Sequence, residues 1–342
     1  MSYFSQRKAS TEQAINYEAH APFPKNALVE LSNACNHACL FCTNSVMVRK
    51  VGMLSIDSYK SFLAQAIDLG LKEVGLYTTG EPFVVQNLAE YIEIAKNMGI
   101  ERVYLTSNGA LATKDKIKEC LDAGLDSLKF SVNAIDRDTY KAVHGKDDWL
   151  KVYQNVMDAK SLQAEYKHFQ ILATCTMSKV TGDISSNFKK IFAGIFEDVL
   201  FRFAEIQGGH NGQYIDTISY KPEIVSEKDI KPCHMLWSRI HLTCEGYLTA
   251  CCIDYDQDLV YADLNKVDLE TGWNCETIKT LRNAHIQKNL NGLLCHSCLT
   301  KQTHQYSPLN TQIPAKLISE KHKDEKIKKY EERVIGISKQ TF

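Results

Sequence analysis

Three cysteines lie close together near the start of the chain, in the segment LSNACNHACLFCTNS. Cys35, Cys39 and Cys42 are separated by three and two residues, and such short spacings let each thiolate bind a different iron of a cubane cluster. Three ligands leave the fourth iron without a protein ligand. An open coordination position is typical of a reactive metal centre, because structural sites are usually closed. The triplet therefore predicts a reactive 4Fe-4S cluster whose fourth ligand comes from outside the chain.

A second group of cysteines lies between residues 233 and 298. The first members flank a predicted β-hairpin that has Gly246 at its turn, and two later ones form a C-x2-C pair after a helical stretch. Together they make a complete set of four ligands for a closed site. The expected ligands are Cys233, Cys251, Cys295 and Cys298.

Three cysteines of this group are left over, and any of them could replace one of those ligands. Cys244 belongs to the same hairpin as Cys251 and is the first substitute to consider. Cys252 directly follows Cys251, so on a strand its side chain would point to the opposite face. Cys275 lies in the helical stretch. A structural zinc ion held by four cysteines is the alternative to a second cluster.

Composition describes a globular protein. The 342 residues carry a net charge of -1 and are 44% hydrophobic, which gives no support to binding of nucleic acid or membrane surfaces. The first residues lack the apolar centre of a secretion signal, so we expect a cytoplasmic location. Thiols stay reduced there. The 12 cysteines therefore point to metal binding or catalysis and away from disulfides.

Short β-like runs alternate with amphipathic helical stretches along the first two thirds of the chain. Strands are predicted at residues 27–31, 73–78, 102–107, 127–132, 169–177 and 199–206. Helices are predicted from Ser55 as a cap, then around 87–97, 113–122, 137–165 and 185–195. Six such units call for a parallel sheet with right-handed crossovers. The predicted fold class is therefore α/β, with a partial (β/α)6 barrel of the TIM type and a small cysteine-rich domain after it.

Ligands bind such sheets at the C-terminal ends of the strands, where the connecting loops meet. The cysteine triplet directly follows the first strand. TTGEP (78–82), TSNG (106–109) and SVN (131–133) follow the next three. We therefore expect these polar segments to surround the triplet.

The triplet, with Phe41 before its last cysteine and a six-unit β/α series around it, resembles the signature of the radical S-adenosylmethionine (SAM) superfamily. The resemblance implies that SAM binds the open iron and is cleaved to a 5'-deoxyadenosyl radical. It also implies that TTGEP corresponds to a GGEP element, with Thr79 in place of the first glycine. The implied cofactor-binding residues are Gly80, Glu81, Ser107, Asn108, Ser131 and Asn133.

The second cysteine group resembles the SPASM and twitch extensions of that superfamily. Because no cysteine follows Cys298, the shortened twitch form with one auxiliary 4Fe-4S cluster is expected. The order of its cysteines is similar to that of aminocyclitol-oxidising members such as 2-deoxy-scyllo-inosamine dehydrogenase. This resemblance implies a two-electron oxidation of a small carbohydrate or aminocyclitol, with the second electron passing to the auxiliary cluster.

A proton acceptor for such an oxidation is sought near the end of the sixth strand. Arg202 and Glu205 are candidates on opposite faces of that strand, and His210 lies just beyond. Epimerisation, with Cys175 or a spare cysteine as hydrogen donor, is one alternative. Decarboxylation and peptide modification are others. A zinc-stabilised protein without catalysis is the alternative of another class.

The expected organisation is an N-terminal extension (1–26), a radical SAM partial barrel (27–206), a SPASM/twitch domain (207–300) and a charged tail (301–342). The tail has helical propensity and carries no recognisable chemistry. The expected partners are a small-molecule substrate and a flavodoxin or ferredoxin-type reductant, with neither nucleic acid nor membrane.

Overall fold

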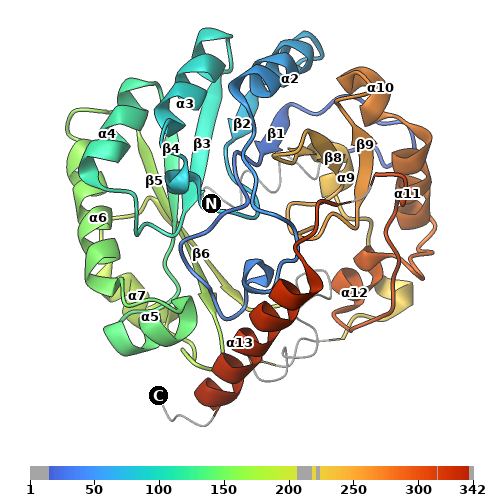
Figure 1. Cartoon of the computed structure of the whole chain (residues 1–342). Helices are drawn as coiled ribbons and strands as arrows, with labels where there is room; N and C mark the ends of the chain where they lie inside the picture. Colours follow the sequence, from blue (N-terminus) through green and yellow to red (C-terminus); the bar gives the residue numbers. More distant parts are fainter. Residues whose placement is uncertain (1–14, 206–217, 221–223, 314, 339–342) are drawn as a thin grey trace.

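The structure of the chain is a computed structural model that describes residues 15–205, 218–220, 224–313 and 315–338. Within these residues nine strands form a single sheet, in the order β6-β5-β4-β3-β2-β1-β7-β8-β9 (Figure 1). The predicted position of His210 lies outside the described residues.

The first six strands are parallel, and each pairs with its neighbour in the sequence. They curve into the partial barrel, so the predicted fold class is confirmed. Their bounds are β1 (Asn26–Val29), β2 (Glu73–Gly75), β3 (Arg102–Ser107), β4 (Ser127–Ser131), β5 (Gln170–Met177) and β6 (Asp198–Phe203). The strand predicted at 199–206 ends early, at Phe203, so the expected alternation of Arg202 and Glu205 on one strand is wrong.

Helices cover the outer face of these strands (Figure 1). They are α2 (Ile56–Asp68), α3 (Leu88–Asn97), α4 (Lys114–Asp122), α5 (Arg137–His144), α6 (Trp149–Leu162) and α7 (Ser185–Ile191). The Ser55 side chain caps α2 by accepting a hydrogen bond from the Ser58 amide, as predicted. The helical material predicted over 137–165 forms two helices, because Gly145 ends α5 in the left-handed conformation with φ 72°.

Alternation along the strands separates the core from the barrel interior. Val103, Leu105, Leu128 and Phe130 belong to the hydrophobic core beneath the helices. The residues between them, on the same two strands, therefore face inward. Paired residues of neighbouring strands lie on the same face of a sheet. Thr174 of β5 pairs with Ser131 of β4, so it also faces inward.

The C-terminal half continues the same sheet on its other side. β7 (Ile240–Leu242) pairs parallel with β1, and β8 (Tyr247–Thr249) and β9 (Val260–Asp263) follow antiparallel. Gly246 forms the predicted turn between β7 and β8 with φ 87°. Helices α9 (Met235–Ser238), α10 (Leu269–Trp273), α11 (Glu276–Ile286) and α12 (Leu294–Thr300) complete this part.

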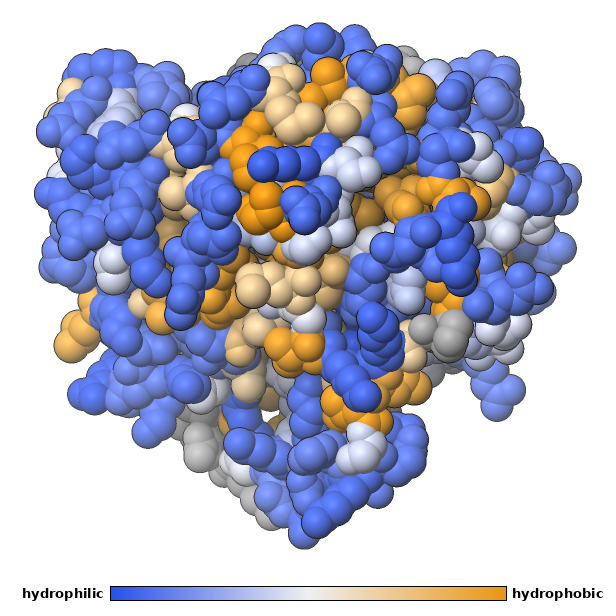
Figure 2. All heavy atoms as spheres, turned by 45° about the horizontal axis from the view of Figure 1, so that its top comes forward, coloured by the Kyte–Doolittle hydropathy of each residue, from blue (hydrophilic) through white to orange (hydrophobic). Residues whose placement is uncertain are grey.

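The tail forms a long helix, α13 (Glu320–Ser338), which lies across the front of the molecule in Figure 1. No described helix is long and apolar enough to cross a membrane. Figure 2 shows that hydrophilic residues cover most of one face, with hydrophobic residues in smaller areas between them.

Candidate active site

The cysteine triplet lies in the loop between β1 and α2, at the C-terminal end of the barrel strands. Burial raises the pKa of all three thiols. The pKa of Cys35 rises to about 12, and the nearby Glu81 carboxylate contributes to that rise. Buried thiols become ligands only when a cation stabilises their thiolates. An iron-sulfur cluster supplies that positive charge, so Cys35, Cys39 and Cys42 fit the predicted group.

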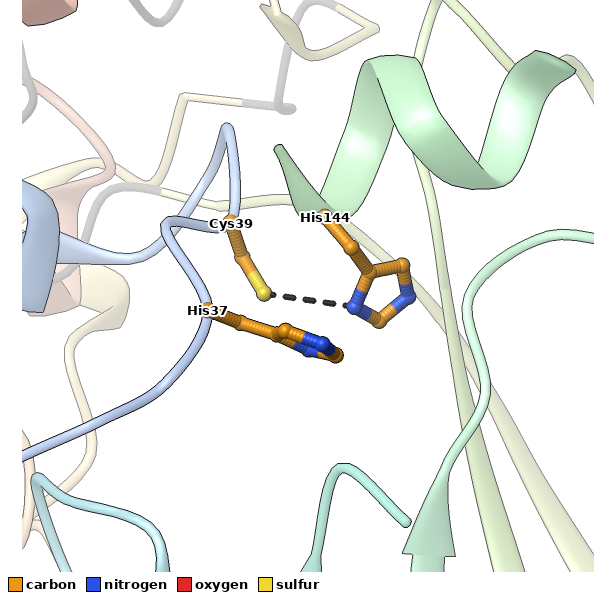
Figure 3. A group of neighbouring side chains, drawn as sticks. All are labelled: His37, Cys39 and His144. Atoms are coloured by element: carbon orange, nitrogen blue, oxygen red, sulfur yellow. Dashed lines mark hydrogen bonds between the residues drawn. The ribbon is translucent and has the colours of Figure 1, made fainter. Parts of the chain in front are cut away.

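Each thiol also has one polar side-chain neighbour from another part of the chain. Asn108 Nδ2 lies 3.8 Å from Cys35 Sγ. His144 Nδ1 lies 3.4 Å from Cys39 Sγ, with the ring of His37 beside the pair (Figure 3). The Tyr255 hydroxyl lies 3.3 Å from Cys42 Sγ.

The TTGEP segment supports the cysteine loop through its backbone. A Cβ atom on Gly80 would lie 2.2 Å from the Ser32 carbonyl oxygen and 2.6 Å from that of Ala34, so only glycine fits there. The Glu81 amide donates to the Ala34 carbonyl at 2.8 Å. Thr79, which departs from the GGEP pattern, donates its hydroxyl to Glu30 at 3.0 Å. The threonine therefore has a partner of its own and leaves Gly80 in register.

Glu81 is buried and accepts several hydrogen bonds. Its carboxylate accepts from the Asn108 amide at 2.7 Å, the Ser107 hydroxyl at 2.7 Å and the Phe83 amide at 3.1 Å. Burial nevertheless raises its pKa to about 7. Three predicted cofactor-binding residues, Glu81, Ser107 and Asn108, thus lie together next to Cys35.

Asn133 lies behind the cysteine loop. Its Oδ1 accepts from the Thr176 amide at 2.8 Å, and its Nδ2 lies 3.4 Å from His144 Nε2. Ser131 ends β4 on the inner face of the barrel. The structure therefore brings Asn133 to the histidine beside Cys39 and leaves Ser131 facing the interior.

The barrel interior is polar. The hydroxyls of Thr106 and Thr174 are buried there, with no hydrogen-bond partner among the described residues. Lys129 faces the same space, with its Nζ 5.7 Å from the centre of the Tyr77 ring. Buried hydroxyls without partners suit a ligand that carries hydrogen-bonding groups.

The proposed catalytic residues lie at the edge of this space. Arg202 pairs in register with Thr176 and donates its Nε to that hydroxyl at 3.2 Å. Glu205 lies beyond β6 and forms an exposed ion pair with Lys301 at 3.2 Å. Cys175 is 0% exposed within the core beneath the helices, so its suggested role as a hydrogen donor in the barrel is wrong.

The four cysteines of the second set line one cavity between β8, α9, α11 and α12. Burial raises the pKa of Cys233, Cys295 and Cys298, in the last case to about 12. Two of the four, Cys295 and Cys298, lie one turn apart on α12. The cavity therefore presents four thiols to one centre, and their burial again calls for a cation.

The left-over cysteines lie elsewhere or at the cavity's edge. Cys244 Sγ is 3.7 Å from Arg49 Nη2, and Cys275 Sγ is 3.5 Å from the Tyr261 carbonyl oxygen. Because β8 ends at Thr249, Cys252 lies in a turn, so the argument from strand alternation is wrong. Contact with the Cys251 thiol and with His241 lowers the pKa of Cys252.

Two family models match this arrangement. Residues 29–173 match the radical SAM superfamily, and residues 233–299 match the SPASM iron-sulfur cluster-binding domain. The chain contains a radical SAM domain and a SPASM-type domain. The cofactors implied by these two domains are SAM, a 4Fe-4S cluster and auxiliary iron-sulfur clusters.

Several curated relatives bear the name probable GTP 3',8-cyclase. The protein of Sulfolobus acidocaldarius is 33% identical over 134 residues, which are 39% of this chain and 42% of that protein. The protein of Sulfurisphaera tokodaii is 25% identical over 283 residues, 73% of this chain and 88% of that protein. The match to the first of these thus spans about two fifths of the relative's length.

Solved structures share the fold. BtrN in complex with AdoMet and 2-DOIA gives a TM-score of 0.55 at 16% identity, over 82% of this chain and 93% of that one. Streptococcus suis SuiB bound to precursor peptide SuiA gives 0.52 at 12% identity, over 89% and 78%.

A buried ion network joins the radical SAM barrel to the SPASM-type domain. Arg49, from the segment after the cysteine loop, lies 2.8 Å from Glu30 of the barrel and 2.7 Å from Glu245 of the β7–β8 turn. The Arg49 guanidinium also donates to the Tyr255 carbonyl at 3.3 Å. Sequence reasoning missed these residues, because nothing in their spacing brings them together.

Helix α13 covers the outer side of the radical SAM cysteine loop. Tyr330 and Arg333 donate hydrogen bonds to the carbonyl oxygens of Leu40 and Ala38, and Lys326 donates to that of Met47 at 2.7 Å. The tail therefore holds the cluster loop, although its sequence carries no recognisable motif. Only its helical periodicity could have suggested that one face is packed.

Proposed function

We propose that this radical SAM protein is an oxidoreductase that removes two electrons from a small polar molecule. Cys35, Cys39 and Cys42 would hold the SAM-binding cluster, and Cys233, Cys251, Cys295 and Cys298 the auxiliary cluster. When bound, the reduced first cluster and SAM supply a hydrogen-abstracting 5'-deoxyadenosyl radical, and the auxiliary cluster supplies an acceptor for the second electron.

One observation carries the choice of an oxidation: four thiols surround the auxiliary cavity. A cluster with a cysteine on each iron has no open position, so it cannot bind the substrate without losing a ligand. Electron transfer is the role that remains for it. The chain's own contribution is to hold the four thiolates and to limit their contact with water, since each of the four cysteines is partly buried.

The inner face of the barrel would orient the substrate. The unpartnered hydroxyls of Thr106 and Thr174 can each donate one hydrogen bond to a substrate hydroxyl. Arg202 and Glu205 remain the proposed contacts for the reacting end, with Glu205 as the group able to accept a proton. The proposed substrate class is a carbohydrate or aminocyclitol. Gly80, Glu81, Ser107, Asn108, Ser131 and Asn133 are the proposed contacts for SAM.

The test is anaerobic turnover of the reconstituted chain with SAM, a reductant and a panel of carbohydrates and aminocyclitols. We expect 5'-deoxyadenosine and a product lighter by two hydrogens, with deuterium passing from labelled substrate into 5'-deoxyadenosine. A product of unchanged mass that gains solvent deuterium would instead establish epimerisation. A colourless protein with bound zinc and no SAM cleavage would refute the enzyme itself.

A second candidate is a nucleotide substrate, as the name of the curated relatives suggests. Lys129 and Arg202 both lie at inward positions of the barrel, where two cations would favour an anionic substrate. GTP therefore belongs in the panel. Consumption of GTP, with deuterium transfer from its ribose to 5'-deoxyadenosine, would favour this candidate over carbohydrate oxidation.

We also propose that a cytoplasmic flavodoxin or ferredoxin-type protein reduces the first cluster. A groove of about 640 Å³ runs between the cysteine loop and α13, and Cys35 is among its lining residues. Lys146, Lys326, Lys329 and Arg333 line it together with one acid, Glu325. This charge suits the acidic surface of such reductants, and Cys35 brings the cluster within reach of that surface.

A further inference from the structure

Two of the three triplet thiols have a strong hydrogen-bond donor beside them, and the two donors come from different halves of the fold. His144 is the last residue of α5, and Tyr255 lies in the loop after Cys251 and Cys252. Both are buried, at 0% and 5% exposure. Neither belongs to the cysteine motif or to the segments TTGEP, TSNG and SVN.

The proton on His144 faces Cys39. The Thr176 amide donates to Asn133 Oδ1 at 2.8 Å, which orients the Asn133 amide so that its Nδ2 faces His144 Nε2 at 3.4 Å. Because Nδ2 can only donate, Nε2 must accept, and the imidazole proton then lies on Nδ1. Nδ1 is the atom 3.4 Å from Cys39 Sγ (Figure 3).

The ring of His144 is held in this orientation from both sides. Tyr140 stacks on it at 4.0 Å between ring centres with an angle of 12°, and His37 meets it edge to face at 5.3 Å. The Nδ1 hydrogen therefore has a fixed direction toward the sulfur.

The Tyr255 hydroxyl donates in the same way once Cys42 is a metal-bound thiolate, because such a sulfur can only accept. Its distance to Cys42 Sγ is 3.3 Å. The Arg49 guanidinium holds the Tyr255 backbone through its carbonyl at 3.3 Å, and Glu245 in turn holds Arg49. The second donor is thus positioned by the SPASM-type domain.

Hydrogen bonds to the sulfur ligands are among the factors that set the potential of an iron-sulfur cluster. The reduced cluster carries one more negative charge, so a donor stabilises it more than the oxidised form. We propose that His144 and Tyr255 are positioning residues that raise the reduction potential of the SAM-binding cluster by donating hydrogen bonds to Cys39 and Cys42. This inference rests on the proposed ligand set.

The test is an anaerobic redox titration of the reconstituted full-length protein, followed by electron paramagnetic resonance. The signal of the first cluster is identified by its change when SAM is added. Tyr255→Phe removes one oxygen and His144→Leu removes the imidazole donor, so each should shift the potential in the negative direction. Tyr59→Phe is the matched control, because Tyr59 is also fully buried and its hydroxyl has no partner among the described residues.

The variant His144→Asn distinguishes loss of the hydrogen-bond donor from loss of the packed imidazole ring. The side-chain amide nitrogen of asparagine can occupy nearly the same place as Nδ1, so this variant should keep a potential close to that of the wild type. Unshifted potentials in Tyr255→Phe and His144→Leu would overturn the inference. Equal shifts in His144→Leu and His144→Asn would overturn the role of His144, because they would trace to lost ring packing.

A second measurement does not depend on the stability of the leucine variant. In wild-type protein grown with 15N-histidine, pulsed resonance of the reduced cluster should show a weak histidine nitrogen coupling that disappears in His144→Asn. Persistence of the coupling in that variant would contradict the assignment.

Two further outcomes separate this inference from the proposed function. Wild-type protein without a 4Fe-4S signal would overturn the ligand set and this inference together, whereas a normal signal with unshifted variants would overturn the inference alone.

His37, Cys39 and His144 also place three metal-binding atoms within 4.8 Å of one another. Bound zinc that is lost in His144→Leu would assign these residues to zinc and overturn the inference.

Discussion

Arg49 and Glu245 contact each other at 2.7 Å although they lie 196 positions apart in the sequence. The pair is buried, and Glu30 makes a second ion pair with the same guanidinium at 2.8 Å. One side chain therefore pairs with two buried carboxylates, one from the barrel and one from the SPASM-type domain. It ties the domain interface to the loop that carries the cysteine triplet.

Replacing Arg49 should destabilise the protein strongly. Arg49→Met leaves Glu30 and Glu245 buried without a counter-charge, which costs about 3–5 kcal/mol. We expect a lower midpoint in anaerobic urea unfolding of the reconstituted protein. The control is Arg137→Met, since Arg137 pairs with Asp147 on the surface and exposed pairs add little. Equal midpoints for the two variants would contradict a structural role for the buried network.

Gly80→Ala should disrupt the cysteine loop. The added methyl group would overlap the carbonyl oxygens of Ser32 and Ala34, so the backbone that leads into Cys35 must move. We expect the reconstituted variant to lose the first cluster, so that about four irons remain in place of about eight. Gly336→Ala is the control, because nothing lies within 4 Å of a Cβ there. Full iron content in Gly80→Ala would show that the loop can adapt.

Helix α13 should slow the loss of the first cluster. Arg333→Ala removes charged hydrogen bonds to the carbonyl oxygens of Ala38 and Val143, and such bonds are worth about 1.5–3 kcal/mol. Anaerobic extraction of iron by a chelator should therefore become about tenfold faster or more. Lys328→Ala, an exposed change on the same helix, should leave the rate unchanged. Identical rates in both variants would mean that the helix only covers the loop.

Cysteine substitutions should separate the auxiliary ligands from their neighbours. Cys298→Ser removes one of the four thiols that line the auxiliary cavity, so iron should fall from about eight to about four per chain, with SAM cleavage retained. Cys275→Ser should keep its iron, because its sulfur lies against the Tyr261 carbonyl. The measurement is the content of iron and sulfide per chain in each variant. Loss of iron in Cys275→Ser alone would reassign the ligand set.

Much of the barrel could be predicted from the sequence because local patterns carry it. Apolar alternation and capping residues placed all six barrel strands and the start of α2, and Gly80 remained in register although Thr79 departs from the family pattern. Prediction failed where an end depends on context. β6 ends at Phe203, three residues before the predicted end, and the boundary between α5 and α6 at Gly145 was not predicted.

The sequence by itself determined which residues could bind iron-sulfur clusters: an open set of three cysteines after the first strand, and a second set of four later. Their spacing is a local property, so it can be read without a fold. Only the tertiary structure decided what surrounds them. His144, Tyr255 and Arg333 reach the cysteine loop from three separate segments. Contacts between distant segments follow from how the sheet, the SPASM-type domain and α13 pack together.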